Sequence, residues 1–231
     1  MPQSGNIISI HQPNYIPWLG YFYKIYQSDV FVFLDDVQFS NQGMHNYHYI
    51  KTPQGPFRLK IPVLKHFKDN INQVKINDAI NWRQKHLKTI ETNYKRSVNF
   101  EEVYTDLKDL LFNDYPDIAV LNSTMIAFFC QKLGISTRFI SSSELNITSS
   151  REQKIIDICI ALDGVVYYSG TGAKAYQDEN NFLNHGLELR YSSFNAFEYP
   201  QLWGDFQSNV TIIDYLMNCG YNWDKVVSHQ K

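Results

Sequence analysis

The chain opens with short apolar runs separated by a polar loop that contains two prolines. Residues 7–10 are apolar except for Ser9 and predict a first strand, which ends before Pro13 and Pro17 because proline cannot join a regular ladder. Residues 18–26 place apolar and aromatic side chains at helical spacing, and residues 30–34 form a β-branched and aromatic run typical of a buried strand. A strand, a loop, a helix and a second strand in this order predict an α/β fold with a parallel strand pair.

Apolar periodicity and turn residues predict further elements along the rest of the chain. Helices are expected over residues 82–94, about 101–112, 117–133, 151–162 and 210–217. Strands are expected as a hairpin over 47–50 and 57–63, and singly over 137–140, 165–169 and 187–191. Because helices and strands alternate without an internal repeat, we expect one domain over residues 1–231, a Rossmann-like parallel or mixed sheet flanked by helices. An irregular insertion is expected around residues 40–100.

Composition places the chain in the globular class and points to aromatic binding surfaces. The 231 residues are 44% hydrophobic and 19% charged, which excludes an intrinsically disordered protein. Aromatic residues make up 15%, with 16 tyrosines, 15 phenylalanines and 4 tryptophans. So many tyrosines exceed the needs of a core, because every buried hydroxyl requires a partner. We therefore expect a site lined with amphipathic rings, which suits sugars, nucleotides and extended thioester arms.

The formal net charge of −2 conceals an uneven distribution. Residues 51–96 hold eleven Lys and Arg against three acidic residues, whereas residues 141–231 hold six against eleven. A basic segment raises the local concentration of anionic partners, although a solvated lysine-rich face explains the same pattern. The near-neutral total gives no indication of a nucleic-acid partner.

Cysteine spacing and the length of apolar runs indicate a cytoplasmic protein. Cys130, Cys159 and Cys219 are odd in number and lie far apart, which argues against a disulfide framework or a zinc knuckle. Cys130 and Cys159 lie in apolar helical contexts and are expected to be buried thiols. The first ten residues lack a leader pattern, and no apolar run approaches the roughly 20 residues of a membrane span. No spacing typical of a metal site occurs, so we expect none.

Four sequence segments carry a resemblance to a known family. They are HQPNYIPWLGYFYKI, SDVFVFLDDVQFS, YYSGTGAKAY and TIIDYLMNCG. Together they resemble the WbqC-like family, which is associated with bacterial O-antigen and surface-polysaccharide gene clusters, and the resemblance extends from His11 to Gly220. After Gln38-Phe39, relatives usually carry an aromatic residue and an Asn-Arg pair, whereas residues 44–47 here are Met-His-Asn-Tyr. The missing arginine weakens the case for anion binding by that loop.

The resemblance implies transfer of an acyl or aminoacyl group, such as glycyl, onto the amine of a deoxyamino sugar. The sugar is expected to be nucleotide-linked. The donor is expected to be a thioester, of phosphopantetheine on a carrier protein or of coenzyme A, with no permanently bound cofactor. The basic segment of residues 51–96 would then dock an acidic carrier protein.

Two alternatives stay open. The first is a nucleotidyltransferase-like enzyme, suggested by the strand, the loop that begins at His11, and the second strand. Such enzymes usually carry a second histidine shortly after the first, whereas Tyr15 and Trp18 occupy that region here. The second alternative is a non-catalytic protein that binds a sugar nucleotide or a carrier.

His11 is the leading candidate for catalysis, because α/β folds place ligands at the carboxyl ends of their strands. An amine that attacks a thioester must be deprotonated, and a histidine near neutral pH suits this task as general base or orienting group. The alternative is a ring that only shapes the loop. Gln12 is expected to donate to a carbonyl or sugar hydroxyl, and Tyr15 and Trp18 to form walls of the pocket.

Two carboxylates, Asp35 and Asp36, follow the second predicted strand and are also assigned to catalysis, with the substrate-binding candidate Gln38 close behind. Adjacent residues on a strand point to opposite sides, so only one carboxylate is expected to face the site. It would bind the ammonium of the sugar, hold His11 in its tautomer or ligate Mg²⁺. Capping of a helix or turn by aspartate is the structural alternative.

The helix predicted over residues 82–94 carries a basic face. Lys85 and Lys88 are three residues apart, so they share this face and could contact a phosphate. His86 lies on the apolar stripe with Trp82, where a satisfied core histidine and a substrate-binding histidine are both open interpretations.

A glycine-rich turn follows the strand predicted over residues 165–169. Ser169, Gly170, Gly172 and Lys174 combine a hydroxyl, bare backbone N–H groups and a positive charge, which suits a diphosphate or a phosphopantetheine phosphate. The spacing is neither that of the P-loop nor that of the Rossmann fingerprint. Tyr176 is expected to stack on a ring of the ligand.

Overall fold

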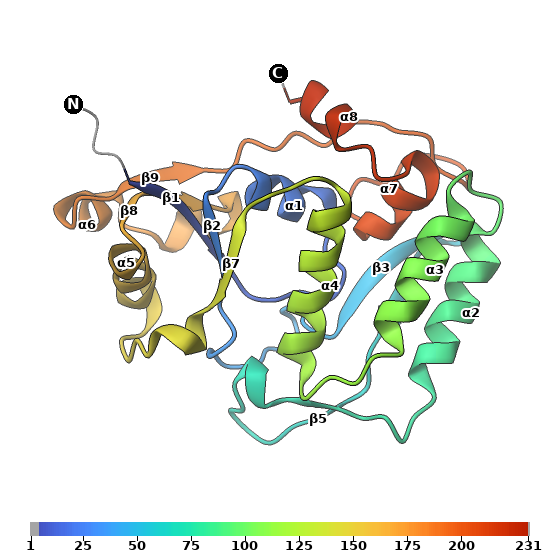
Figure 1. Ribbon diagram of the computed structural model, residues 1–231, viewed down its shortest axis with the longest axis horizontal. Coiled ribbons are helices and arrows are strands. Elements are labelled where there is room, and N and C mark those ends of the chain that lie inside the picture. Colours follow the sequence, from blue (N-terminus) through green and yellow to red (C-terminus); the bar gives the residue numbers. More distant parts are fainter. Residues whose placement is uncertain (1–4, 231) are drawn as a thin grey trace. The chain divides into compact units, whose positions relative to one another are not determined.

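The computed structural model describes residues 5–230 of the chain (Figure 1). These residues form two compact units. The first, called the sheet unit below, comprises the residues up to Pro13 together with Gly20–Asp36 and Ile135–Phe194. The second, the hairpin unit, comprises Asn14–Leu19, Val37–Gly134 and the residues from Asn195 onward. The prediction of a single domain stays a prediction.

The sheet unit contains a five-stranded sheet in which every neighbouring pair is parallel. This confirms the predicted α/β class. The strand order is β7-β2-β1-β8-β9, so the chain first builds outward on one side of β1 and then crosses to the other side. The point where this direction reverses lies between β1 and β8. The strands are β1 (Asn6–His11), β2 (Val30–Phe33), β7 (Arg138–Ser141), β8 (Gly164–Ser169) and β9 (Glu188–Tyr191).

Alternating side chains of the central strands supply two apolar faces. Ile8 and Ile10 of β1, with Val30 and Val32 of β2, belong to a buried cluster that includes apolar residues of the helices α5 (Arg151–Ala161) and α6 (Glu179–Asn184). Phe31, which alternates with these valines, contacts Tyr21 of α1 (Leu19–Tyr26) at 5.4 Å between ring centroids. Helices therefore cover both faces of the sheet, and for this reason the central strands are nearly continuous apolar runs in the sequence.

The hairpin unit confirms the predicted hairpin in strands β3 (Tyr47–Thr52) and β4 (Gly55–Lys60), which pair antiparallel. A second, very short pair lies in the stretch expected to be irregular and joins β5 (Val63–Leu64) to β6 (Lys75–Ile76). The sequence did not reveal this pair, because two residues are too few for a periodic pattern. Its helices are α2 (Trp82–Tyr94), α3 (Phe100–Leu111), α4 (Ile118–Lys132), α7 (Ile212–Cys219) and α8 (Trp223–Ser228).

Two helix starts illustrate how local chemistry sets the boundaries. Helix α4 begins one residue later than predicted, because the side chain of Asp117 accepts the N–H of Val120 and makes Asp117 the N-cap. Helix α7 begins two residues later than predicted, since the hydroxyl of Thr211 accepts the N–H of Ile213 and makes Thr211 the N-cap. Helix α8 was not predicted, because six residues carry too little periodicity.

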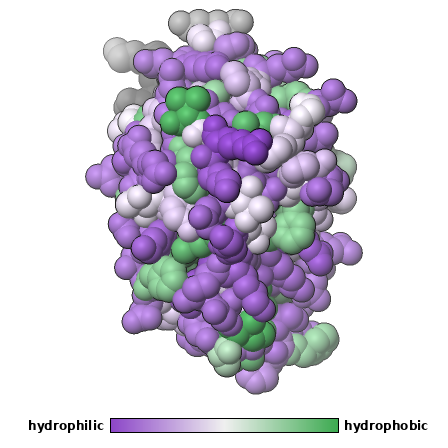
Figure 2. Space-filling model, turned by 90° about the vertical axis from the view of Figure 1, so that its right-hand side faces the viewer, coloured by the Kyte–Doolittle hydropathy of each residue, from purple (hydrophilic) through white to green (hydrophobic). Residues whose placement is uncertain are grey.

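The surface that Figure 2 turns toward the viewer, the right-hand side of Figure 1 where α2 and α3 lie, is mostly hydrophilic with scattered apolar side chains. Every helix within residues 5–230 is too short or too polar to cross a membrane. Cys130 and Cys159 are buried free thiols, as predicted, and Cys219 is half-buried and free. Burial raises the pKa of the Cys159 thiol to about 12, which keeps it protonated and unreactive.

Candidate functional site

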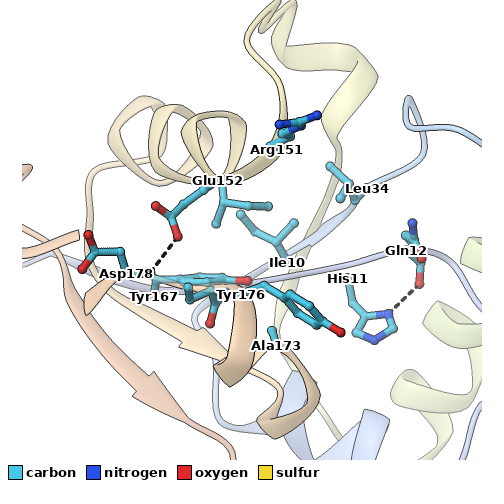
Figure 3. Close-up of a pocket in the computed structure, with 12 residues that line it drawn as sticks. Ile10, His11, Gln12, Leu34, Arg151, Glu152, Tyr167, Ala173, Tyr176 and Asp178 are labelled. Atoms are coloured by element: carbon cyan, nitrogen blue, oxygen red, sulfur yellow. Dashed lines mark hydrogen bonds between the residues drawn. The ribbon is translucent and has the colours of Figure 1, made fainter. Parts of the chain in front are cut away.

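A cavity of about 620 Å³ opens at the carboxyl ends of the central strands of the sheet unit (Figure 3). It lies where the strand order reverses, which is the place where open α/β sheets bind ligands. We call it the switch-point pocket. Its lining residues are Ile10, His11, Gln12, Leu34, Arg151, Glu152, Ile155, Tyr167, Ala173, Tyr176, Gln177 and Asp178.

The backbone pairing of β1 with β8 stops before the carboxyl ends of both strands, near the pocket. Their ladder reaches the pair of Ile8 and Tyr167, and beyond it side chains replace the backbone bonds. The hydroxyl of Ser9 donates to the carbonyl of Tyr168 at 2.8 Å, and the buried Nζ of Lys24 donates to the carbonyl of Ile10 at 2.8 Å. Burial lowers the pKa of Lys24 to about 7, so this amine sits near the boundary between its charged and neutral forms.

His11, the last residue of β1, enters the pocket with a defined tautomer. Its Nδ1 lies 2.9 Å from the carbonyl oxygen of Gln12, and a carbonyl only accepts, so Nδ1 carries the proton of the neutral ring and Nε2 carries the lone pair. The ring meets Tyr21 edge-on at 4.8 Å, and the Tyr21 hydroxyl donates to the same Gln12 carbonyl at 2.9 Å. The Tyr21 ring and the Gln12 carbonyl thus fix the orientation of the imidazole.

Two tyrosines flank the apolar part of the pocket (Figure 3). Tyr167 stacks on Phe182 of α6 with ring centroids 5.3 Å apart, and burial raises its pKa to about 12, so its phenol stays neutral at physiological pH. Tyr176 is 84% exposed, which leaves its ring open to a ligand. Aliphatic side chains of Ile10, Leu34 and Ile155 complete this wall.

Three charged residues line the pocket, and none of them was a candidate from the sequence. Glu152 accepts the backbone N–H of Asp178 at 2.9 Å and the side-chain amide of Asn181 at 2.7 Å. Asp178 in turn caps α6 by accepting the N–H of Asn180. Arg151 begins α5 with φ at +56°, in the left-handed region that few non-glycine residues adopt. Arg151 and Glu152 lie at a predicted helix start, and nothing else in the sequence distinguishes the three residues from ordinary surface charges.

Asp35 and Asp36 lie outside the pocket lining, and their carboxylates contact neighbouring loops. Asp35 is 7% exposed and accepts from the N–H and the hydroxyl of Ser143 at 3.0 and 2.7 Å. Asp36 pairs with Nζ of Lys154 at 2.7 Å, and both aspartates accept from the hydroxyl of Ser142. The sequence offered capping as the structural alternative for these aspartates but did not predict the ion pair of Asp36. Together the contacts connect β2 to α5 and to the segment before it. Their expected catalytic role stays a prediction.

The structure places Tyr15, Trp18 and His86 in the hairpin unit, and none of them is a lining residue of the pocket. The carbonyl of Lys60 lies 3.2 Å from Nε2 of His86, so Nε2 donates, and the Tyr15 hydroxyl donates to Nδ1 at 3.0 Å. Burial lowers the pKa of His86 to about 4, which keeps the ring neutral. His86 is therefore a satisfied core histidine. Trp18 stacks on the buried His48, with the ring centroids 6.0 Å apart.

Two grooves of the hairpin unit contain the remaining candidates of that unit. Gln38 lines a groove of about 540 Å³ between residues 38–42 and 65–69. Lys85 lines a second groove of about 480 Å³, here called the basic groove, between β4 and α2. The basic groove contains four cations and no acidic residue among its lining residues, which are Phe57, Arg58, Leu59, Lys60, Lys85, His86, Lys88 and Thr89.

Of the site residues predicted in the glycine-rich turn after β8, Tyr176 alone lines the pocket. Ser169 is buried at the end of β8, and Nζ of Lys174 lies 5.6 Å from the centroid of the Tyr191 ring. A Cβ added at Gly170 or Gly172 would meet nothing within 4 Å, and neither residue has a positive φ. The fold itself therefore does not require glycine at these two positions.

A five-stranded parallel sheet with a pocket at its switch point defines a doubly wound α/β protein. Within residues 5–230, no three His, Cys, Asp or Glu side chains lie close enough together to hold a metal ion.

The chain belongs to the WbqC-like protein family, whose family model matches residues 12–225, and this confirms the resemblance found in the sequence. It is 31% identical over 217 residues to "Uncharacterized protein Rv1507c" of Mycobacterium tuberculosis (strain ATCC 25618 / H37Rv). That alignment covers 92% of this chain and 94% of the mycobacterial protein. No solved structure matches the chain significantly.

Proposed function

We propose that the protein is an N-acyl or aminoacyl transferase that modifies the amine of a nucleotide-linked deoxyamino sugar in surface-polysaccharide biosynthesis. The observation that carries this proposal is the position of His11 in the switch-point pocket. Its Nδ1–H is held by the Gln12 carbonyl, so the lone pair of the neutral ring is on Nε2. The aromatic and aliphatic lining beside it suits a sugar ring or a thioester arm. The free cysteines agree with a cytoplasmic location.

The proposed reaction needs one base and no redox chemistry. The amine nitrogen attacks the thioester carbonyl carbon, so a C–N bond forms and the C–S bond breaks. Nε2 of His11 takes the proton that the amine loses and returns it to the departing thiolate. Gln12 and the neutral phenol of Tyr167 are the proposed hydrogen-bond partners of the substrate in the same pocket.

The basic groove supports an acidic carrier protein as the thioester donor. Arg58, Lys60, Lys85 and Lys88 face this groove without a lining carboxylate, and Lys88 makes only an exposed ion pair with Glu91. Such a surface steers an anionic partner and raises the rate of encounter.

Charge reversal in the basic groove tests whether a carrier protein docks there. We expect Lys85→Glu with Lys88→Glu to lower carrier-dependent kcat/KM by about tenfold, mainly through slower encounter. Turnover with a coenzyme A thioester should be unchanged. The matched control is Lys95→Glu with Lys108→Glu, two exposed lysines outside the groove. Equal losses in both double variants would remove the docking role of the groove.

The central experiment incubates the purified full chain with a dTDP-linked amino sugar and either an acyl-loaded carrier protein or an acyl coenzyme A. The expected product is an amide, detected as the mass of the sugar nucleotide increased by that of the acyl group. Absence of product across several acyl and aminoacyl donors would refute the proposal. Release of pyrophosphate from ATP in the same mixture would favour the nucleotidyltransferase-like alternative instead.

A further inference from the structure

The switch-point pocket has an apolar wall and a cationic end. Ile10, Leu34 and Ile155 form a wall without hydrogen-bonding groups, beside the open ring of Tyr176. A flat heteroaromatic ring fits between such surfaces, because aliphatic contact and stacking both favour burial of its faces. The volume of about 620 Å³ exceeds what a nucleobase alone would fill, so the pocket has room for further groups beside this wall.

The cationic end consists of Arg151. Among the described residues, no hydrogen bond or ion pair engages its guanidinium, whereas the other cations near the pocket are occupied. Lys154 pairs with Asp36 at 2.7 Å, and Lys174 lies over the ring of Tyr191. A guanidinium presents parallel N–H donors that match phosphate oxygens.

The two acidic lining residues point away from Arg151. In Figure 3 the carboxylate of Glu152 is directed toward Asp178, on the opposite side of the pocket from Arg151. Both carboxylates are engaged there, Glu152 by the Asp178 N–H and by Asn181, and Asp178 by the N-terminus of α6. The acidic residues and the arginine thus occupy different ends of the pocket, which leaves the Arg151 end suited to an anion.

We propose that the switch-point pocket binds a nucleoside diphosphate group, with the base against the aliphatic wall and Tyr176, and the diphosphate on Arg151. The proposal rests on the proposed function, since both of its substrates can carry this group. A nucleotide-linked sugar contains it on the acceptor side, and coenzyme A contains it on the donor side. In this arrangement the diphosphate lies on Arg151 and not on Ser169, Gly170, Gly172 and Lys174, which the sequence favoured for a diphosphate or a phosphopantetheine phosphate.

Isothermal titration calorimetry with the full chain tests the assignment and separates the two sources. The probes are dTDP, thymidine, and coenzyme A. We expect Arg151→Ala to weaken binding of the favoured diphosphate by about tenfold or more, the range for loss of a charge-assisted contact to phosphate. Arg151→Lys should recover part of the loss. Thymidine, which lacks phosphate, should bind wild type and Arg151→Ala equally.

The matched control is Arg138→Ala. Arg138 is an exposed arginine of the same unit, at the amino end of β7 and outside the pocket. Arg138→Ala changes the net charge by the same amount as Arg151→Ala, so unchanged affinity in this variant supports a local contact between Arg151 and the diphosphate. Thermal unfolding of each variant confirms that it is folded before titration.

Tighter binding of dTDP would assign the pocket to the sugar nucleotide, and tighter binding of coenzyme A would assign it to the donor. Absence of binding by both at millimolar concentration would overturn the inference, and so would equal losses in the Arg151 and Arg138 variants. Amide formation without such binding would leave the proposed function standing and refute only this inference. Binding without amide formation would support this inference and refute only the proposed function.

Discussion

At the residue scale, His11 and His86 differ in what their ring nitrogens contact. His86 uses both nitrogens in the core, on Tyr15 and on the Lys60 carbonyl, and burial lowers its pKa to about 4. His11 donates from Nδ1 to a backbone carbonyl at the edge of a pocket, which assigns its lone pair to Nε2. Sequence periodicity placed His86 on an apolar stripe but could not name its partners, since they come from other segments of the chain.

The proposed base gives a test that separates catalysis from binding. We expect His11→Ala to lower kcat by at least about a hundredfold, the usual contribution of a positioned general base, while dTDP binds with unchanged affinity. The control is His66→Ala, because the His66 side chain is 95% exposed and lies in the other unit. Loss of binding together with turnover would instead give His11 a structural role in the loop.

At the element scale, Asp36 and Lys154 connect β2 to α5. Their ion pair is mostly buried, with side-chain exposures of 20% and 8%. Each charge is therefore costly to leave alone in the interior. The sequence showed an acidic pair after a strand, but only the packing of α5 decided that one of its two members would meet a lysine.

Removal of one partner of this pair should destabilise the sheet unit strongly. We expect Lys154→Met to lower the free energy of unfolding by about 3 kcal/mol, and the double variant with Asp36→Asn to recover part of that loss. Urea unfolding measures both. Lys88→Met removes an exposed ion pair and should change stability by less than about 0.5 kcal/mol. A Lys154→Met protein as stable as wild type would contradict the connecting role.

Glycines of two loops should respond oppositely to a methyl group. Gly172→Ala finds open space and an ordinary φ, so it should stabilise the protein by roughly 0.4–1 kcal/mol through the unfolded chain. Gly43→Ala would bring its Cβ into steric overlap with the buried His45 ring and should destabilise the protein. Thermal unfolding compares the two. If Gly172→Ala were destabilising, the turn after β8 would carry a constraint that the fold does not account for.

At the scale of the whole molecule, buried neutral histidines set the response to acid. Burial lowers the pKa of both His48 and His86 to about 4, from an ordinary value of 6.5. Between these values the unfolded chain binds protons that the folded protein does not. Their contribution to stability is therefore complete above pH 6.5 and is lost as the pH falls toward 4.

The expected size of this effect is at most roughly 3 kcal/mol for each ring. Urea unfolding midpoints at pH 7.0, 5.5 and 4.5 should decline steeply in wild type. The decline should be shallower in a His48→Gln, His86→Gln double variant, whereas the exposed control His66→Gln should follow wild type. An equal decline in all three proteins would assign the acid sensitivity to other groups.

The sequence by itself determined the class of sheet, most helices and strands, and the family, because apolar periodicity and motif spacing are local properties. It also placed His11 and Gln12 at the end of the first strand, where the pocket lies. Only the tertiary structure decided which charges reach that pocket, since Arg151, Glu152 and Asp178 come from segments far along the chain. The same long-range packing placed Asp35 and Asp36 against Ser142, Ser143 and Lys154, and made His86 part of the core.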